Sequence, residues 1–440
     1  MSLFYIKKIF FVVLLMLLFL EIFSQVVFYW STGHFLCLQK NPPPVRDFPK
    51  TEEYQLGFNL HPYFGWANPV GVPVTRLPFK AEKFLYPLTS QQVDWLTLKA
   101  NNLGFISRHR YPAFSTASDK NVFVVGIFGG SVAVWFSLQG EKVLEKLLST
   151  LPAAQGKKVV ILNFAQVSFK QPQQLLVLNF LDAIGQKIGL VIELDGVNET
   201  ISADIQKEFG LDVAMPNFGQ LARILTTYSI FGQSLENQVI IGKATKTQLK
   251  INKIKNFLNR RSFIGRSALI NLGAVGYLRF LEWLLGGDLA KIQRSQNFGK
   301  TSPINLAEHS YQTRQEAVEE MANVWARCSL QMKALVEGGQ GGRYFHFLQP
   351  VPQFGKHHFS YAEKRDALYH TYFNRLVLES YPVFLKKGEQ LKKKGLKFFS
   401  LSEIFDETPA VVYADVCHLN QRGNEILAEK IATLIKANYN

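Results

Sequence analysis

The sequence predicts an α/β fold in which helices cover both faces of a parallel β-sheet. From Asn121 onward, short runs of β-branched and aromatic residues alternate with longer segments of helical pattern. These runs are continuously apolar, which is typical of parallel strands buried on both faces. A hydrophobic content of 47% over 440 residues, with 13% aromatic residues, excludes a disordered chain and allows a large core.

The N-terminal segment has the composition of a membrane-spanning helix. Lys7 and Lys8 precede an apolar run from Ile9 to Trp30, which is roughly 33 Å long as a helix and interrupted by Glu21. No A-x-A site follows, so we predict an uncleaved signal anchor over residues 1–30, with a cleaved signal peptide as the alternative. The lysines keep the N-terminus inside, which predicts a single-pass protein of the inner or plasma membrane with an extracytoplasmic, periplasmic domain.

Residues 31–120 are expected to connect this anchor to the main domain. The proline-rich stretch KNPPPVRDFPK predicts an extended linker. HPYFGWANPVGVP and NNLGF follow, rich in aromatic and turn-forming residues, and predict an irregular segment packed on the main domain.

The core is predicted in two parts, residues 121–204 and 305–440. The expected strands are, in order, NVFVVGIF, KKVVILNFA, GLVIELDG, RYFHFLQP and LKFFSLS. Helices are expected after Ser131, at QPQQLLVLNFLDAIGQK, around Trp325 with its apolar face on the core, and at QRGNEILAEKIATLIKA.

Residues 205–304 interrupt this alternation and are predicted to form an insertion. SALINLGAVGYLRFLEWLLGG contains Arg279 and Glu282, so we expect an amphipathic helix on the membrane or a cap helix rather than a second span. The formal charge of +15 is concentrated in a run without acidic residues, formed by Lys243, Lys246, Lys250, Lys253, Lys255, Arg260, Arg261 and Arg266. An exported chain does not meet nucleic acid, so this run indicates anionic lipid, an acidic glycan or a solvated loop.

No metal or cofactor site is predicted. The chain has only three cysteines, without metal-ligand spacing: Cys37, Cys328 and Cys417. Cys417 is expected to be a small buried neighbour of His418. His346, His357 and His358 match no ligand pattern and are expected to line a pocket or face solvent.

Candidate catalytic groups follow the predicted strands. Ser131 follows the first strand, Ser168 the second and Asn198 the third, and Asp415 and His418 precede the last helix. The carboxyl ends of parallel strands meet at one edge, so these groups are expected to converge. His418 would take the proton of Ser131 while Asp415 orients the imidazole. The N–H groups of Ser131, Ser168 and the Asn198 side chain would stabilise an oxyanion.

Two phosphate-binding motifs are excluded for the turn at Gly129-Gly130-Ser131. No lysine precedes Ser131 as a Walker loop requires, and the glycines do not fit G-x-G-x-x-G. A purely structural turn stays an alternative. Asp195 is expected to cap its loop rather than to assist catalysis.

In their order and spacing, these segments resemble the conserved blocks of the SGNH (GDSL-type) hydrolases. The Asp415-x-x-His418 pair followed by Leu-Asn-x-x-Gly-Asn is the most specific of them. The resemblance implies a three-layer α/β/α, flavodoxin-like fold and hydrolysis or transfer of acyl esters. It implies that Ser131 is the nucleophile, that Asp415 and His418 complete the triad, and that Asn198 and the Ser168 backbone form the oxyanion hole.

Three positions depart from the family pattern. Gly130 replaces the aspartate before the nucleophile, Ser168 replaces a glycine, and Glu199 replaces an aspartate.

We predict a membrane-anchored serine esterase or O-acyltransferase acting on acyl groups, expected to be acetyl, of a cell-envelope or secreted glycan. The alternatives are an inactive glycan-binding or assembly subunit, which the departures at Gly130 and Ser168 keep open, and a lipid-directed lipase or thioesterase.

Overall fold

The computed structural model describes residues 3–32, 35, 37, 58–76, 84, 93–116, 119–228, 235–258, 267–295 and 305–439. The chain divides into two compact units. The larger contains Leu56–Thr227 and Asn305–Asn440, and the smaller contains Met1–Gln55 and Tyr228–Ile304.

The larger unit is built on a five-stranded parallel sheet. Its strands are β3 (Val122–Gly129), β4 (Lys158–Asn163), β5 (Leu190–Asp195), β6 (Arg343–Leu348) and β7 (Lys397–Ser400). Their spatial order is β4-β3-β5-β6-β7, and every neighbouring pair is parallel. Numbered along the chain, this is the order 2-1-3-4-5 of flavodoxin-like folds. The predicted fold class and all five predicted strands are confirmed.

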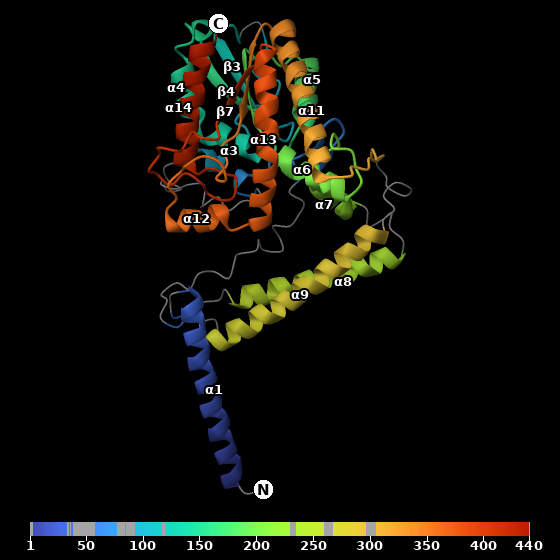
Figure 1. Ribbon diagram of the computed structural model, residues 1–440, viewed down its shortest axis with the longest axis vertical. Helices are drawn as coiled ribbons and strands as arrows, with labels where there is room; N and C mark the ends of the chain where they lie inside the picture. Colours follow the sequence, from blue (N-terminus) through green and yellow to red (C-terminus); the bar gives the residue numbers. More distant parts are fainter. Residues whose placement is uncertain are drawn as a thin grey trace. The chain divides into compact units, whose positions relative to one another are not determined.

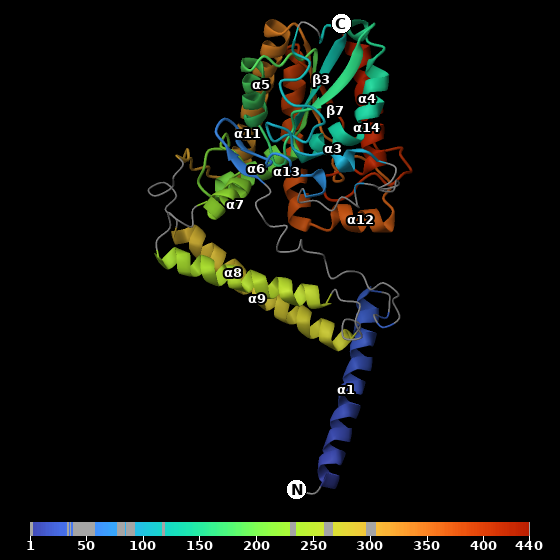
Figure 2. The same cartoon turned by 180° about the vertical axis from the view of Figure 1, so that it is seen from behind.

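Helices cover both faces of the sheet (Figures 1 and 2). One face packs against α3 (Ser131–Gln139), α4 (Glu141–Leu148) and α14 (Gln421–Asn438). The other face carries α5 (Gln173–Ala183), α6 (Val197–Glu208), α11 (Arg314–Lys333) and α13 (Thr371–Lys393). Because strand residues alternate between faces, Ile192 and Leu194 of β5 face the first layer, while Glu193 and Asp195 face the second.

Shorter elements complete the larger unit. They are β1 (Asn59–His61), β2 (Gly65–Ala67), η3 (Val74–Arg76), η5 (Trp95–Thr97), η7 (Pro152–Ala154), α7 (Phe218–Tyr228), the π-helix η10 (Ala334–Gly339) and α12 (Tyr361–Leu368). The segment before β3 packs on the sheet edge that carries the strand ends. Trp66 donates through Nε1 to the carbonyl of Val167 at 3.0 Å, and Trp95 donates to Gln421 Oε1 at 3.1 Å.

The smaller unit contains three helices among its described residues, α1 (Leu3–Thr32), α8 (Leu235–Leu258) and α9 (Ala268–Ser295). Within α1, Lys7–Val27 is long and apolar enough to cross a membrane. The linker KNPPPVRDFPK lies outside the described residues, as do Arg260, Arg261 and Arg266. Lys243 to Lys253 lie on α8, so of the three alternatives the solvated loop does not hold for this part of the run. The predicted insertion was 205–304, whereas α6 and most of α7 group with the larger unit.

Candidate active site

Ser131 lies where β3 gives way to α3. Gly129 has φ 143°, and a Cβ there would lie 2.1 Å from the carbonyl oxygen of Leu194, so only glycine permits this close strand-to-helix turn. Gly130 is the extended N-cap of α3, and Ser131 is its first residue. The Ser131 N–H therefore has no acceptor within the helix and is free to bind a ligand oxygen.

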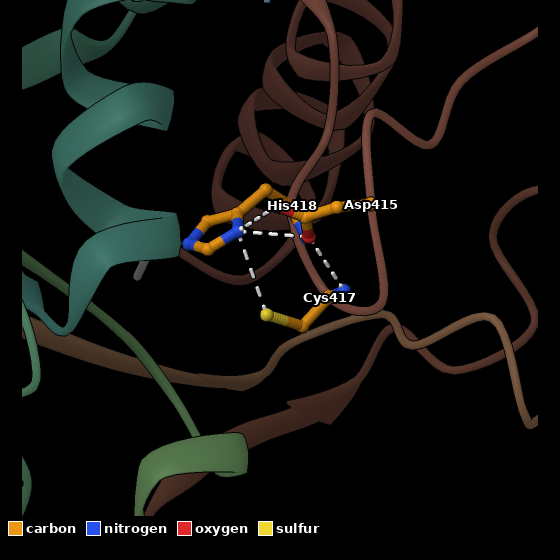
Figure 3. A group of neighbouring side chains, drawn as sticks. All are labelled: Asp415, Cys417 and His418. Carbon is orange, nitrogen blue, oxygen red and sulfur yellow. Dashed lines mark hydrogen bonds and ion pairs between the residues drawn. The ribbon is translucent and has the colours of Figure 1, made fainter. Parts of the chain in front are cut away.

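His418 joins Ser131 to Asp415. The Ser131 hydroxyl lies 2.8 Å from His418 Nε2, and His418 Nδ1 lies 2.8 Å from Asp415 Oδ2. Figure 3 shows the imidazole of His418 next to the carboxylate of Asp415 and the thiol of Cys417. Asp415 Oδ1 also accepts the backbone N–H groups of Cys417 and His418, at 3.0 and 2.9 Å, which fixes the turn. The structure thus brings Ser131, which the sequence analysis placed after the first strand, together with Asp415 and His418, which it placed before the last helix.

The charges of this group favour a basic imidazole. Burial alone would lower the pKa of His418, but its interactions with Asp415 and Cys417 together outweigh burial and raise this pKa well above its ordinary value. Burial likewise opposes ionisation of Asp415, yet His418 and two backbone N–H donors hold the pKa of this carboxyl well below its usual range. Asp415 is therefore ionised, and His418 is a strong proton acceptor.

Cys417 is a buried neighbour of the imidazole, as predicted. Its Sγ lies 3.6 Å from His418 Nδ1 (Figure 3). Burial raises the pKa of the Cys417 thiol, so it stays protonated at neutral pH.

Asn198 lies against the nucleophile turn. Its Nδ2 donates to the carbonyl of Phe169 at 2.7 Å, and a Cβ on Gly130 would lie only 2.0 Å from the same nitrogen. The side chain thus passes over Gly130, in space that any larger residue would occupy. One of its two N–H groups is used by Phe169, which leaves the second for an oxyanion.

Ser168 has φ 61°, in the left-handed region that glycine favours. In the parts of the chain that the structure describes, its N–H donates to no other group. The loop is held from both sides, because Gln166 N donates to the carbonyl of Gly129 at 3.2 Å and Trp66 donates to the carbonyl of Val167. The departure from glycine therefore keeps a glycine-like backbone with a free N–H.

Glu199 connects the two loops that carry Ser168 and Asn198. One carboxylate oxygen accepts Gln171 N–H at 3.0 Å and the other accepts Gly196 N–H at 2.9 Å. Lys170, which is fully buried, donates to the carbonyls of Gln171 and Val213, at 2.8 and 2.6 Å. Burial is the main cause that raises the pKa of Glu199. The sequence analysis noted Glu199 only as a departure and did not foresee this role.

The loop with Asp415 and His418 has supports that the sequence analysis missed. The expectation that His357 faces a pocket or solvent is wrong: it is buried, with Nε2 3.2 Å from Glu363. Glu363 in turn accepts the N–H groups of Val412 and Tyr413, each at 2.9 Å. Phe84, from the irregular N-terminal segment, packs edge-on to His418 with a ring distance of 5.6 Å. An aromatic residue in an irregular segment gave no signal of this contact.

A second buried polar cluster lies behind the strand ends, on the α11 side of the sheet. Asp195 Oδ1 accepts from Trp325 Nε1 and from His346 Nε2, each at 2.8 Å. The expectation that Asp195 caps its own loop is therefore wrong, as is the expectation that His346 lines a pocket or faces solvent. Trp325 is fully buried, as predicted. Burial is the main cause that raises the pKa of Glu193 well above its usual value, and its carboxyl group is hydrogen-bonded to Gln171 and the Tyr344 hydroxyl.

Two groups of described residues have ligand-type atoms close enough to share an ion: Asp415 with Cys417 and His418, and Glu193 with Asp195 and His346. The first group is the site described above. In the second, His346 and Asp195 are hydrogen-bonded to each other, and Glu193 is held by other side chains. In both groups, these hydrogen bonds explain why the ligand-type atoms lie close together.

No protein-family model and no curated protein sequence matches the chain. Among solved structures, the chain is similar to an acetyl xylan esterase with 8% sequence identity, covering 71% of this chain and 100% of that chain at a TM-score of 0.34. The fold class rests on the strand order of the sheet and not on this likeness.

Proposed function

We propose that the protein is a membrane-anchored, SGNH-type serine esterase or O-acyltransferase. The observation that carries this proposal is the continuous hydrogen-bonded chain from the Ser131 hydroxyl through His418 to Asp415. A buried serine at a helix N-terminus, next to an imidazole held by an ionised carboxylate, has the arrangement that activates a hydroxyl nucleophile.

The chemistry would proceed through an acyl-enzyme. Ser131 Oγ bonds to the ester carbonyl carbon as its proton passes to His418 Nε2. The N–H groups of Ser131, Ser168 and Asn198 stabilise the resulting oxyanion. As the C–O bond to the leaving alcohol breaks, His418 returns the proton to that oxygen. Water, or a hydroxyl group of a second glycan, then attacks the acyl carbon while His418 takes its proton. The bond from the acyl carbon to Ser131 Oγ breaks, and His418 returns the proton to Ser131, which gives hydrolysis or transfer.

The proposed substrate is an O-acyl ester, acetyl in the simplest case, on a cell-envelope or secreted glycan. An exported domain behind the apolar span of α1 would meet such esters outside the cytoplasm. The inactive-subunit alternative rested on Gly130 and Ser168. Both have a structural reason that is compatible with activity, since Gly130 makes room for Asn198 and Ser168 keeps a free backbone donor.

The test is labelling of the purified full-length chain with a fluorophosphonate, together with turnover of an aryl acetate. Ser131→Ala and His418→Ala should each remove several orders of magnitude of activity, and the double variant little more, because the two groups act as a unit. Ser137→Ala is the matched control, since Ser137 lies on the same helix and its hydroxyl bonds to the carbonyl of Val134 at 2.7 Å.

A wild-type chain that neither labels nor turns over esters would leave the inactive-subunit alternative in place. A preference for long-chain over acetyl esters would instead favour the lipase alternative. Addition of a glycan acceptor separates transfer from hydrolysis, because only transfer gives an acylated acceptor.

A further inference from the structure

The smaller unit carries a surface that the proposed chemistry does not use. Its helices α8 and α9 run antiparallel side by side (Figures 1 and 2). Ile251 of α8 and Leu278 and Leu281 of α9 are buried between them, each at most 4% exposed. These residues define the seam of the hairpin.

A second apolar face of α9 is exposed. Tyr277 is 47% exposed, Phe280 50% and Trp283 71%, and Ile270 and Leu284 lie on the same side of the helix. Single exposed apolar residues are common on soluble proteins, but a stripe along four turns of one helix indicates an interaction surface.

The exposed face of α8 is basic. Lys243, Lys246, Lys250 and Lys253 are all exposed, and their spacing of three, four and three residues puts them on one face. None of them forms an ion pair with any residue that the structure describes. The side chain of Lys255 lies outside the described residues.

The basic face and the aromatic face lie on the same side of the hairpin. Each helix is viewed here from its own N-terminus. The helical repeat then places the lysine face of α8 about a third of a turn from the seam, and it places the aromatic face of α9 at the same angle in the same rotational sense. Because the two helices are antiparallel, an equal rotation in the same sense turns both faces toward one side. The hairpin therefore presents a row of cations beside a row of aromatic and aliphatic side chains.

A partly buried acidic residue ties this hairpin to α1. Glu21 Oε2 accepts the Ser267 hydroxyl at 2.5 Å and the Leu269 N–H at 3.1 Å, and so caps the N-terminus of α9. Glu21 lies six residues before Val27, the last residue of the apolar span, which corresponds to about 9 Å along the helix. The start of α9 is therefore held beside the last third of that span, about 9 Å from its end.

We propose that the α8–α9 hairpin lies along an anionic lipid bilayer, with the Trp283 face at the boundary of headgroups and acyl chains and the four lysines among the phosphates. A cationic row beside an apolar row is the pattern of interfacial helices, and aromatic side chains favour this depth. An acidic glycan would satisfy the lysines but not Ile270 and Leu284. The proposal rests on the anchor in the proposed function and is independent of the esterase chemistry.

The test uses the full-length chain reconstituted into phosphatidylcholine vesicles with and without phosphatidylglycerol. The emission of Trp283 is obtained as the difference between the wild type and Trp283→Phe. In anionic vesicles it should be quenched by lipids brominated near the headgroup and protected from acrylamide. Added salt, or glutamine at Lys243, Lys246, Lys250 and Lys253, should reverse this protection severalfold, because screening weakens the attraction.

The matched control replaces four exposed lysines of the larger unit by glutamine, Lys146, Lys157, Lys187 and Lys430, and should leave Trp283 protected. Equal acrylamide access in both kinds of vesicle would overturn the proposal, as would stronger protection by a soluble acidic polysaccharide. Protection without lipid quenching would indicate packing against another part of the chain. Extraction of the chain by alkaline carbonate would show instead that the α1 anchor is wrong.

Discussion

Gly130→Ala tests whether the glycine before Ser131 is needed to make room for the Asn198 side chain. The Gly130 backbone, with φ −89°, accepts alanine without strain, so any effect comes from the added methyl group. That methyl group would lie 2.0 Å from Asn198 Nδ2 and 3.1 Å from the carbonyl oxygen of Phe169. Ordinary contact begins near 3.4 Å, so the amide would have to move by about 1.4 Å.

A shift of this size breaks the 2.7 Å bond from Asn198 to Phe169 and moves the second N–H away from the oxyanion. We expect turnover of an aryl acetate to fall by about 10²–10³, as for loss of one oxyanion donor, with KM little changed. Overpacking should also reduce the free energy of unfolding by about 1–3 kcal/mol.

Two control variants show whether the effect of Gly130→Ala acts through Asn198. Gly338→Ala has open space around its Cβ and should leave turnover unchanged without lowering stability. Asn198→Ala should lose the same factor in turnover, and combining it with Gly130→Ala should restore stability without a further loss of activity. If Gly130→Ala keeps wild-type turnover, or if the two losses multiply in the double variant, Asn198 is not the donor that Gly130 accommodates.

Three further predictions concern the surrounding groups. Catalysis needs neutral His418, whose pKa Asp415 raises, so wild-type turnover should fall as pH falls through that raised pKa. In Asp415→Asn the acid limb of the pH profile should move to lower pH, and turnover should be reduced by about 10⁴. Ser168→Gly should retain activity, whereas Ser168→Pro, which removes the N–H and cannot adopt φ 61°, should lose about 10²–10³ in turnover. Glu199→Gln should lower turnover and melting temperature together, while the exposed Glu208→Gln on the same helix should change neither.

The elements that dominate the fold were predictable because their signals are local. Each core strand is a short, mainly apolar run, and Ser131, Ser168 and Asn198 follow the carboxyl ends of the first three. The sheet then brings Ser131, Asp415 and His418 together by topology alone. The order of the strands thus places these three residues at one edge of the sheet, although their mutual distances were not derivable from the chain.

The supports of the site were not predictable because they are contacts between distant positions. Asp195 meets Trp325 and His346, which follow it by 130 and 151 residues, and a carboxylate next to a turn gave no indication of such partners. The same holds for Phe84, which reaches His418 from an irregular segment without periodicity. Hydrogen bonds and ring contacts of this kind form only in the packed structure, and they join residues that lie far apart in the sequence.

The two departures that cast doubt on activity are adjacent parts of one arrangement. Gly130 leaves space for the Asn198 amide, and that amide bonds to the carbonyl of Phe169, the residue after Ser168. An aspartate at position 130 would place its Cβ where the amide now lies. The absence of a side chain at position 130 therefore allows Asn198 to join the Ser131 turn to the Ser168 loop. Gly130 and Ser168 therefore belong to one packed arrangement around Asn198, and each residue has a structural reason for its place other than loss of a motif.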